Sequence, residues 1–103
     1  MSGFKLQPSG EQSWSVFGDL GIADAPAALA TGLATFDLAR RTVLDLSAVG
    51  RTDSAGLAVL VEWSRRARAA GGSVELHSLP EQMRAVATLS GLDELLDTGT
   101  AGD

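Results

Sequence analysis

Two short stretches near the start of the chain alternate between apolar and polar residues, which predicts two strands. They are "FKLQ" (4–7) and "SWSVFGDL" (13–20), and the segment "PSGEQ" between them contains a glycine, as hairpin turns do. Two later runs, "TVLDLS" (42–47) and "SVELHS" (73–78), are rich in Val and Leu and bounded by turn residues. Such runs are typical of buried central strands.

Helical spacing of apolar residues separates these predicted strands. A first helix is expected to begin at Asp24, as N-cap, with Pro26 in its first turn, where a missing N–H costs least. Its apolar face consists of Leu29, Leu33 and Phe36. A second helix begins at Ser54 and ends at the glycines of "RAAGG", because glycine readily adopts the backbone conformation of a helix C-terminus.

A third helix is predicted after residue 78. Ser78 and Glu81 fit a capping box, in which each side chain bonds a free backbone N–H of the first turn. Its inward stripe would be Leu79, Met83, Val86 and Leu89. Gly91 ends the helix, and "LDELL" after it is expected to form a short turn or edge element.

The order of these elements predicts an α/β fold. Strand, helix and strand over residues 42–77 form a βαβ unit, so the two strands should be parallel and joined by a right-handed crossover. We expect a small mixed sheet of about four to five strands with helices packed on it. The length of 103 residues suits a single domain, 1–103.

Composition removes several classes of function. The formal net charge of −5 argues against nucleic acid as a ligand. The chain contains no cysteine and one histidine, His77, so a disulfide framework, a thiolate site or a clustered metal site is not expected. The first ten residues do not resemble a signal peptide, and no apolar run approaches the roughly 20 residues that span a bilayer. We therefore expect a cytoplasmic protein without direct membrane insertion.

The segment "TDSAG" (52–56) is the candidate site, and most catalytic readings of it fail. A P-loop needs a lysine beside its Ser or Thr, whereas the only lysine here is Lys5. A nucleophile elbow needs glycine where Thr52 stands. A serine hydrolase would need His77 against Ser54, and nothing in the sequence requires that.

What remains is a hydroxyl at the start of a helix. Asp53 or Ser54 can accept hydrogen bonds from the first-turn N–H groups, which alone explains both residues. The same position tolerates a phosphate, because the helix dipole and the N–H groups favour negative charge. Ala55 and Gly56 leave Ser54 uncrowded, so its hydroxyl is expected to be accessible to modification or to a partner.

The helix that follows has two apolar sides. Its sheet-facing stripe is predicted to be Leu57, Leu60, Val61 and Ser64, and the other side carries Val59, Trp63, Arg66 and Ala70. A tryptophan beside arginines is typical of the centre of a protein interface. Equally, Trp63 would fold over the helix edge and cover core leucines. The sequence leaves both interpretations open.

The segment "VLDLSAVGRTDSAGLAVL" resembles the STAS domain family, in which "DSAGL" matches the signature. "FGDL" is similar to the family's G-E-L motif, with Asp19 where glutamate is usual, and "GIADAPAAL" departs from the usual segment. Within the family, the second half of the chain, from "LVEWSRR" to "SGLDELL", is most similar to the MlaB group.

That resemblance implies a non-catalytic subunit without cofactor or metal. It would bind the MlaF-like ATPase subunit of a phospholipid-transporting ABC complex, which includes a permease, at the cytoplasmic side of the inner membrane. The partner-binding residues would be Thr52, Asp53, Ser54, Ala55, Gly56, Val59, Trp63 and Arg66. The alternative is an anti-sigma-factor antagonist switched by phosphorylation of Ser54. A homodimer of the isolated domain is also left open.

Overall fold

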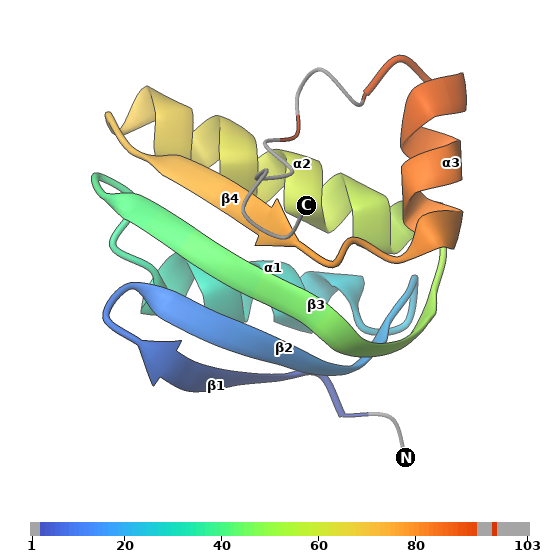
Figure 1. The fold of residues 1–103 in the computed structure, drawn as a ribbon, viewed down its shortest axis with the longest axis horizontal. Helices are drawn as coiled ribbons and strands as arrows, with labels where there is room; N and C mark the ends of the chain where they lie inside the picture. Colours follow the sequence, from blue (N-terminus) through green and yellow to red (C-terminus); the bar gives the residue numbers. More distant parts are fainter. Residues whose placement is uncertain (1–2, 93–95, 97–103) are drawn as a thin grey trace.

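The computed structural model describes residues 3–92 and residue 96 and consists of one sheet with three helices (Figure 1). In chain order, the elements are β1 (Lys5–Gly10), β2 (Ser13–Leu20), α1 (Ala25–Thr35), β3 (Arg41–Thr52), α2 (Ser54–Ala69), β4 (Ser73–His77) and α3 (Glu81–Leu89). The predicted mixed α/β class is confirmed.

The four strands lie in the order β1-β2-β3-β4. β1 pairs antiparallel with β2, as the hairpin prediction requires, whereas β2 with β3 and β3 with β4 are parallel pairs. The parallel pairing confirms the βαβ unit. Because α1 and α2 each follow a parallel strand, both helices begin at the same end of the sheet, on the right in Figure 1. That end carries the candidate site.

One face of the sheet is covered by α1 and α2 (Figure 1). Alternate residues of β3 and β4 point into this layer and are fully or almost fully buried, such as Leu44, Leu46 and Leu76. Leu57 and Leu60 of α2 meet them from the helix side. The core therefore consists mainly of aliphatic side chains, as expected for a chain with few aromatic residues, together with Trp63 and Phe36.

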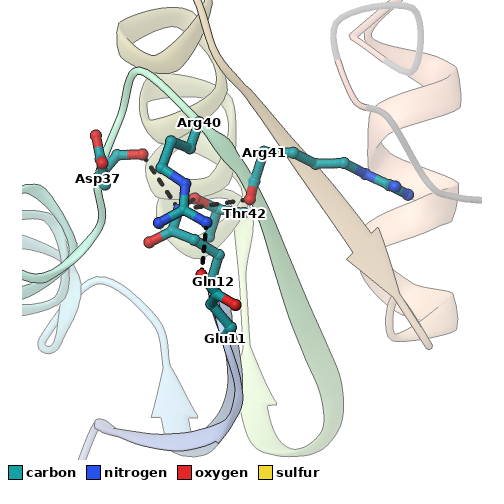
Figure 2. Close-up of polar contacts among 6 residues, drawn as sticks. All are labelled: Glu11, Gln12, Asp37, Arg40, Arg41 and Thr42. Carbon is teal, nitrogen blue, oxygen red and sulfur yellow. Dashed lines mark hydrogen bonds and ion pairs between the residues drawn. The ribbon is translucent and has the colours of Figure 1, made fainter.

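The end of the sheet opposite the site is fastened by polar side chains (Figure 2). The Gln12 side-chain amide donates to the Asp37 carbonyl at 3.2 Å and to Thr42 Oγ1 at 3.0 Å. Arg40 forms an ion pair with Glu11 at 3.0 Å, between exposed side chains. These contacts join the β1–β2 turn to the segment that leads into β3.

Trp63 and Val59 are buried, which corrects their predicted place on a partner-binding surface. Trp63 is 0% exposed: its indole N–H donates to the Leu29 carbonyl of α1 at 3.3 Å, and a side chain at Gly32 would collide with the ring. The alternative, that Trp63 covers the core, is confirmed. α2 packs on the sheet and on α1 together, so both of its apolar sides face inward.

The start and the inward stripe of α3 also differ from the prediction. The N-cap is Pro80, without a side-chain cap, and Ser78 has a positive φ of 58°, so the Ser78–Glu81 capping box does not form. Leu89 is 88% exposed, while Ala87 is buried in its place. α3 packs against α2, and of its predicted stripe only Leu79 and Met83 are buried, while Val86 is half-buried. Most of the predicted closing element, at 93–95, lies outside the described residues.

Candidate functional site

The candidate site lies where β2 and β3 end side by side, with Leu20 opposite Thr52. The β2–α1 loop and the β3–α2 junction enclose a shallow pocket of about 260 Å³. Its lining residues are Asp19, Gly21, Ile22, Ala23, Asp24, Arg51, Thr52 and Asp53. Two loops that are about 30 residues apart in the sequence therefore form one surface.

Asp53 is the residue that joins the two loops. It is the N-cap of α2, and its Oδ1 accepts from the backbone N–H of Ala55 at 2.8 Å and of Gly56 at 3.3 Å. Its Oδ2 accepts from the backbone N–H of Ile22, in the other loop, at 3.0 Å. The hydrogen bond from Ile22 and those from Gly56 and Ala55 lower the pKa of Asp53 from its ordinary value of 3.8, against a smaller opposing effect of desolvation.

Two glycines allow this close approach. A Cβ at Gly21 would lie 2.9 Å from Asp53 Oδ2, inside the space that the carboxylate occupies. At Gly56 a Cβ would collide with the Leu20 carbonyl, because the first turn of α2 lies directly against the end of β2. The glycine of "TDSAG" is thus required for packing between a helix and a strand, and no phosphate loop is needed to explain it.

Ser54 is exposed at the first position of α2, as the sequence predicted. No residue in the described part of the chain hydrogen-bonds its hydroxyl, since Asp53 already accepts from the free N–H groups of the turn. Ala55 beside it is half-buried, and Ala58, one turn further, is exposed. The hydroxyl is therefore exposed at the helix start, with alanines at positions 55 and 58.

Asp19 and Arg51 complete the polar rim. Asp19 Oδ1 accepts from the backbone N–H of Arg51 at 2.8 Å, so the carboxylate fixes the end of β3. The side chain of Arg51 is exposed next to the pocket. Thr52 Oγ1 is buried without a hydrogen-bond partner among the described residues. Thr52 is thus directed inward rather than toward a partner.

A family model described as "Mlab, STAS domain" matches residues 7–97. The chain belongs to the STAS family. No curated protein matches its sequence significantly.

Solved structures share the fold of this STAS domain. A candidate anti-sigma factor antagonist from Thermotoga maritima is 24% identical over 91% of this chain and 83% of its own, with a TM-score of 0.73. The anti-sigma factor antagonist SpoIIAA in its unphosphorylated form is 18% identical over 97% and 90%, with a TM-score of 0.68. An anti-sigma-factor antagonist (STAS) domain protein from Planctomyces limnophilus is 19% identical over 88% and 86%, with a TM-score of 0.67.

The STAS domain brings together only part of the predicted site. Asp53, Ser54, Ala55 and Gly56 lie together with Thr52 at the α2 start, but Gly56 and the Thr52 hydroxyl are covered. Arg66 is exposed about three turns along α2, where its guanidinium pairs with Glu62 at 2.7 Å. The pKa of Glu62 is lowered by hydrogen bonds from Arg66 and then Arg65. Arg66 therefore belongs to a helix-surface ion pair separate from the loop site.

The sequence reasoning missed Ile22, whose side chain is 76% exposed at the rim of the pocket. The sequence contained one indication of this exposed residue. Ile22 is the only large apolar residue in "GIADAP", which joins a predicted strand to a predicted helix, and it belongs to the apolar pattern of neither. A loop residue of this kind has no periodic pattern to mark its burial, so its exposure could only come from the structure.

His77, the histidine of this STAS domain, contacts a carboxylate outside the candidate site. His77 Nε2 contacts the buried carboxylate of Glu75, which also pairs with Arg41. Within residues 3–92 and 96, no group of three His, Asp or Glu side chains is arranged to bind a metal ion. In the same part of the chain, every helix is too short or too polar to cross a bilayer. STAS domains are typically regulatory proteins without catalytic activity.

Proposed function

We propose that this STAS domain is a non-catalytic, MlaB-like accessory subunit of a phospholipid-transporting ABC complex. It binds the cytoplasmic, MlaF-like ATPase subunit, through which it is peripheral to the inner membrane, and supports the assembly or activity of a transporter that maintains outer-membrane lipid asymmetry. The main support is the family model described as "Mlab, STAS domain", which spans 7–97.

The geometry of the α2 start supports a role in binding a protein. Ser54 offers a hydroxyl that is exposed and engaged by no described residue, on a helix start fixed by Asp53. A surface that is already ordered loses little conformational entropy on binding. By contacting one conformation of the ATPase better than another, such a domain shifts the conformational equilibrium of its partner.

A charge placed at Ser54 tests this proposal. We expect Ser54→Arg to reduce the amount of ATPase subunit that co-purifies with the domain by about tenfold or more, since a guanidinium would be desolvated in the interface. Ser9→Arg is the matched control, because Ser9 is an exposed residue of β1 near the opposite end of the sheet. Both variants should retain the thermal unfolding midpoint of the wild type. Equal recovery of the ATPase with all three proteins contradicts the proposal.

The second candidate is an anti-sigma-factor antagonist, which the structural similarity to proteins of that class favours. Here a kinase would phosphorylate Ser54, and the added charge of about −1.5 to −2 would repel the kinase partner. Incubation of the domain with candidate anti-sigma kinases and ATP, followed by mass spectrometry, distinguishes the two functions. Phosphate on Ser54 with loss of kinase binding supports the antagonist, whereas an unmodified protein bound to an ABC ATPase supports the transporter subunit.

A further inference from the structure

Ile22 is an apolar side chain that the fold leaves uncovered. Among the described residues, the large hydrophobic side chains that are exposed are those of Phe17, Ile22 and Leu89, at 37%, 76% and 88%. Ile22 differs from the other two because it lies beside the α2 start, at the rim of the pocket. Exposing an isoleucine to water forgoes the free energy of burying it, unless another molecule covers it.

The backbone that carries Ile22 is fixed. Its N–H donates to Asp53 Oδ2 at 3.0 Å, and the turn around it is closed by the Asp24 N–H donating to the Gly21 carbonyl at 3.0 Å. The same Asp53 carboxylate caps α2 through Ala55 and Gly56. Ile22 and Ser54 are therefore held in one arrangement by a single side chain, although one lies in the β2–α1 loop and the other begins α2.

The surroundings of Ile22 indicate what kind of surface would cover it. Ala23, Pro26 and Ala27, which follow in the loop and the first turn of α1, are exposed and uncharged. The pocket on the other side has three carboxylates, those of Asp19, Asp24 and Asp53, and one guanidinium, that of Arg51. A complementary surface has an apolar recess for the isoleucine and basic side chains around that recess.

We propose that Ile22 is the apolar anchor of the partner-binding surface, that it inserts into an apolar recess with a basic rim on the partner protein, and that Asp53 positions it relative to Ser54. The inference rests on the proposed function in one respect: a protein partner contacts the start of α2. It adds the β2–α1 loop to that interface and states the chemistry of the opposing surface.

Site-specific photo-crosslinking of the full chain in its own cells tests the inference. A benzophenone amino acid is introduced at Ile22, at Ala58 on the exposed side of α2, or at Leu89, and crosslinked proteins are identified by mass spectrometry. Leu89 is the matched control, because it is equally apolar and even more exposed but lies at the far end of α3 (Figure 1). We expect the probes at 22 and 58 to crosslink to the same protein and the probe at 89 to leave that protein unlabelled.

The identity of the crosslinked protein separates this inference from the proposed function. An ABC ATPase labelled from both positions supports both proposals. An anti-sigma kinase labelled from both positions overturns the transporter role but supports the Ile22 interface. Labelling of the ATPase from position 58 alone supports the transporter role and overturns the role of Ile22 as an anchor. Equal labelling from positions 22 and 89 also overturns the anchor. If neither position 22 nor position 58 labels any protein, the anchor is overturned as well.

Binding measurements with the identified partner then test the energetic role. Ile22→Ala should weaken the affinity by about tenfold or more, as expected for an apolar anchor in a recess, and Leu89→Ala should leave it unchanged. Asp53→Ala should reduce the effect of Ile22→Ala, because the isoleucine is no longer held in place in that background. Additive effects of the two substitutions would overturn the positioning role of Asp53.

Discussion

At the scale of single residues, one carboxylate accounts for most of the order in the candidate site. Asp53 accepts three backbone N–H groups, one from the β2–α1 loop and two from the first turn of α2, and the glycines at 21 and 56 leave it the space to do so. The sequence predicted a cap from either Asp53 or Ser54, and the structure shows that Asp53 provides it. The bond to Ile22 joins residues that are 31 positions apart, which no local pattern encodes.

Removing this carboxylate should destabilise the domain in a pH-dependent way. We expect Asp53→Ala to lower the Tm by several degrees near neutral pH, because three N–H groups lose their acceptor. The folded-state pKa of Asp53 lies below its ordinary value of 3.8, so the stabilisation is fully present above about that pH and is lost as the pH falls through the lowered pKa. The Tm difference between wild type and variant should therefore be constant from pH 5 to 7 and shrink below about 3.8.

Asp37→Ala is the control for this thermal denaturation series. The Asp37 side chain accepts one hydrogen bond, from the Ala39 N–H at 3.2 Å, on an exposed turn. Its replacement should lower the Tm less than that of Asp53. If the Tm of Asp53→Ala equals that of the wild type at pH 7, water replaces the three hydrogen bonds without loss. The Asp53 carboxylate would then contribute nothing to the stability of the fold.

At the scale of helices and strands, the sequence predicted what local patterns encode. The hairpin, the parallel strand pair and the starts of α1 and α2 follow from alternation, helical spacing and turn residues, and they are found within a few positions. Asp24 stands at the predicted N-cap of α1, although its side chain makes no capping bond there. Only backbone geometry shows that Ser78 turns the chain with a positive φ and delays α3 to Glu81.

The two apolar sides of α2 show why the sequence could not predict which of its residues are buried. Helical spacing identifies which residues share a side, but it does not say which neighbouring element covers that side. Trp63 lies beneath α1 because Gly32 leaves room for its ring, and Phe36 packs edge-on against it at a centroid distance of 5.1 Å. A buried tryptophan and an interface tryptophan therefore look alike in this sequence until α1 is placed.

The burial of Trp63 predicts a structural effect when it is replaced. Trp63→Ala should lower the free energy of unfolding by about 3–5 kcal/mol, since it removes a buried ring and leaves a cavity between α1 and α2. A loss of this size approaches the whole stability of a small domain. Urea denaturation followed by circular dichroism measures it. Leu89→Ala, at an exposed position, should change the free energy by less than about 0.5 kcal/mol.

Unchanged stability of Trp63→Ala together with loss of partner binding would assign Trp63 to the partner-binding surface. If Trp63→Ala unfolds at the same urea concentration as the wild type and yet fails to recover the partner, the ring contacts the partner instead of the core. A variant that loses both stability and binding at the same time is explained by unfolding alone. Trp63→Phe keeps most of the apolar volume and loses the hydrogen bond to Leu29, so it should be destabilised less than the alanine variant.

At the scale of the whole molecule, the two ends of the sheet have different roles. One end is closed by the contacts of Gln12, Arg40 and Glu11, which link the hairpin turn to the entry of β3 (Figure 2). At the other end, the carboxylates of the loops are used to fix backbone N–H groups, and Ser54 and Ile22 are left exposed. The fold is thus ordered where it meets the proposed partner, and it offers that partner one apolar and one hydroxyl group in a negatively charged setting.

This arrangement predicts that charge and apolar contact act on different rate constants of partner binding. The chain has a net charge of −5, and the pocket beside Ile22 has more carboxylates than guanidinium groups, so approach to a basic surface should be steered electrostatically. Raising the ionic strength from about 0.01 M to about 1 M shortens the Debye length from about 30 Å to about 3 Å. We expect the association rate constant, measured by surface plasmon resonance, to fall by about tenfold over that range.

Ile22→Ala separates the two contributions. Because it changes no charge, the variant should keep the salt dependence of the association rate constant, while its dissociation rate constant should rise by about tenfold at every salt concentration. An association rate that does not respond to salt would mean that the carboxylates at the pocket serve only to order the loops. In that case the specificity of the surface would rest on the shape of the recess around the isoleucine and on the exposed guanidinium of Arg51, since the other exposed groups there, an alcohol and small alkyl side chains, carry no charge for a partner to read.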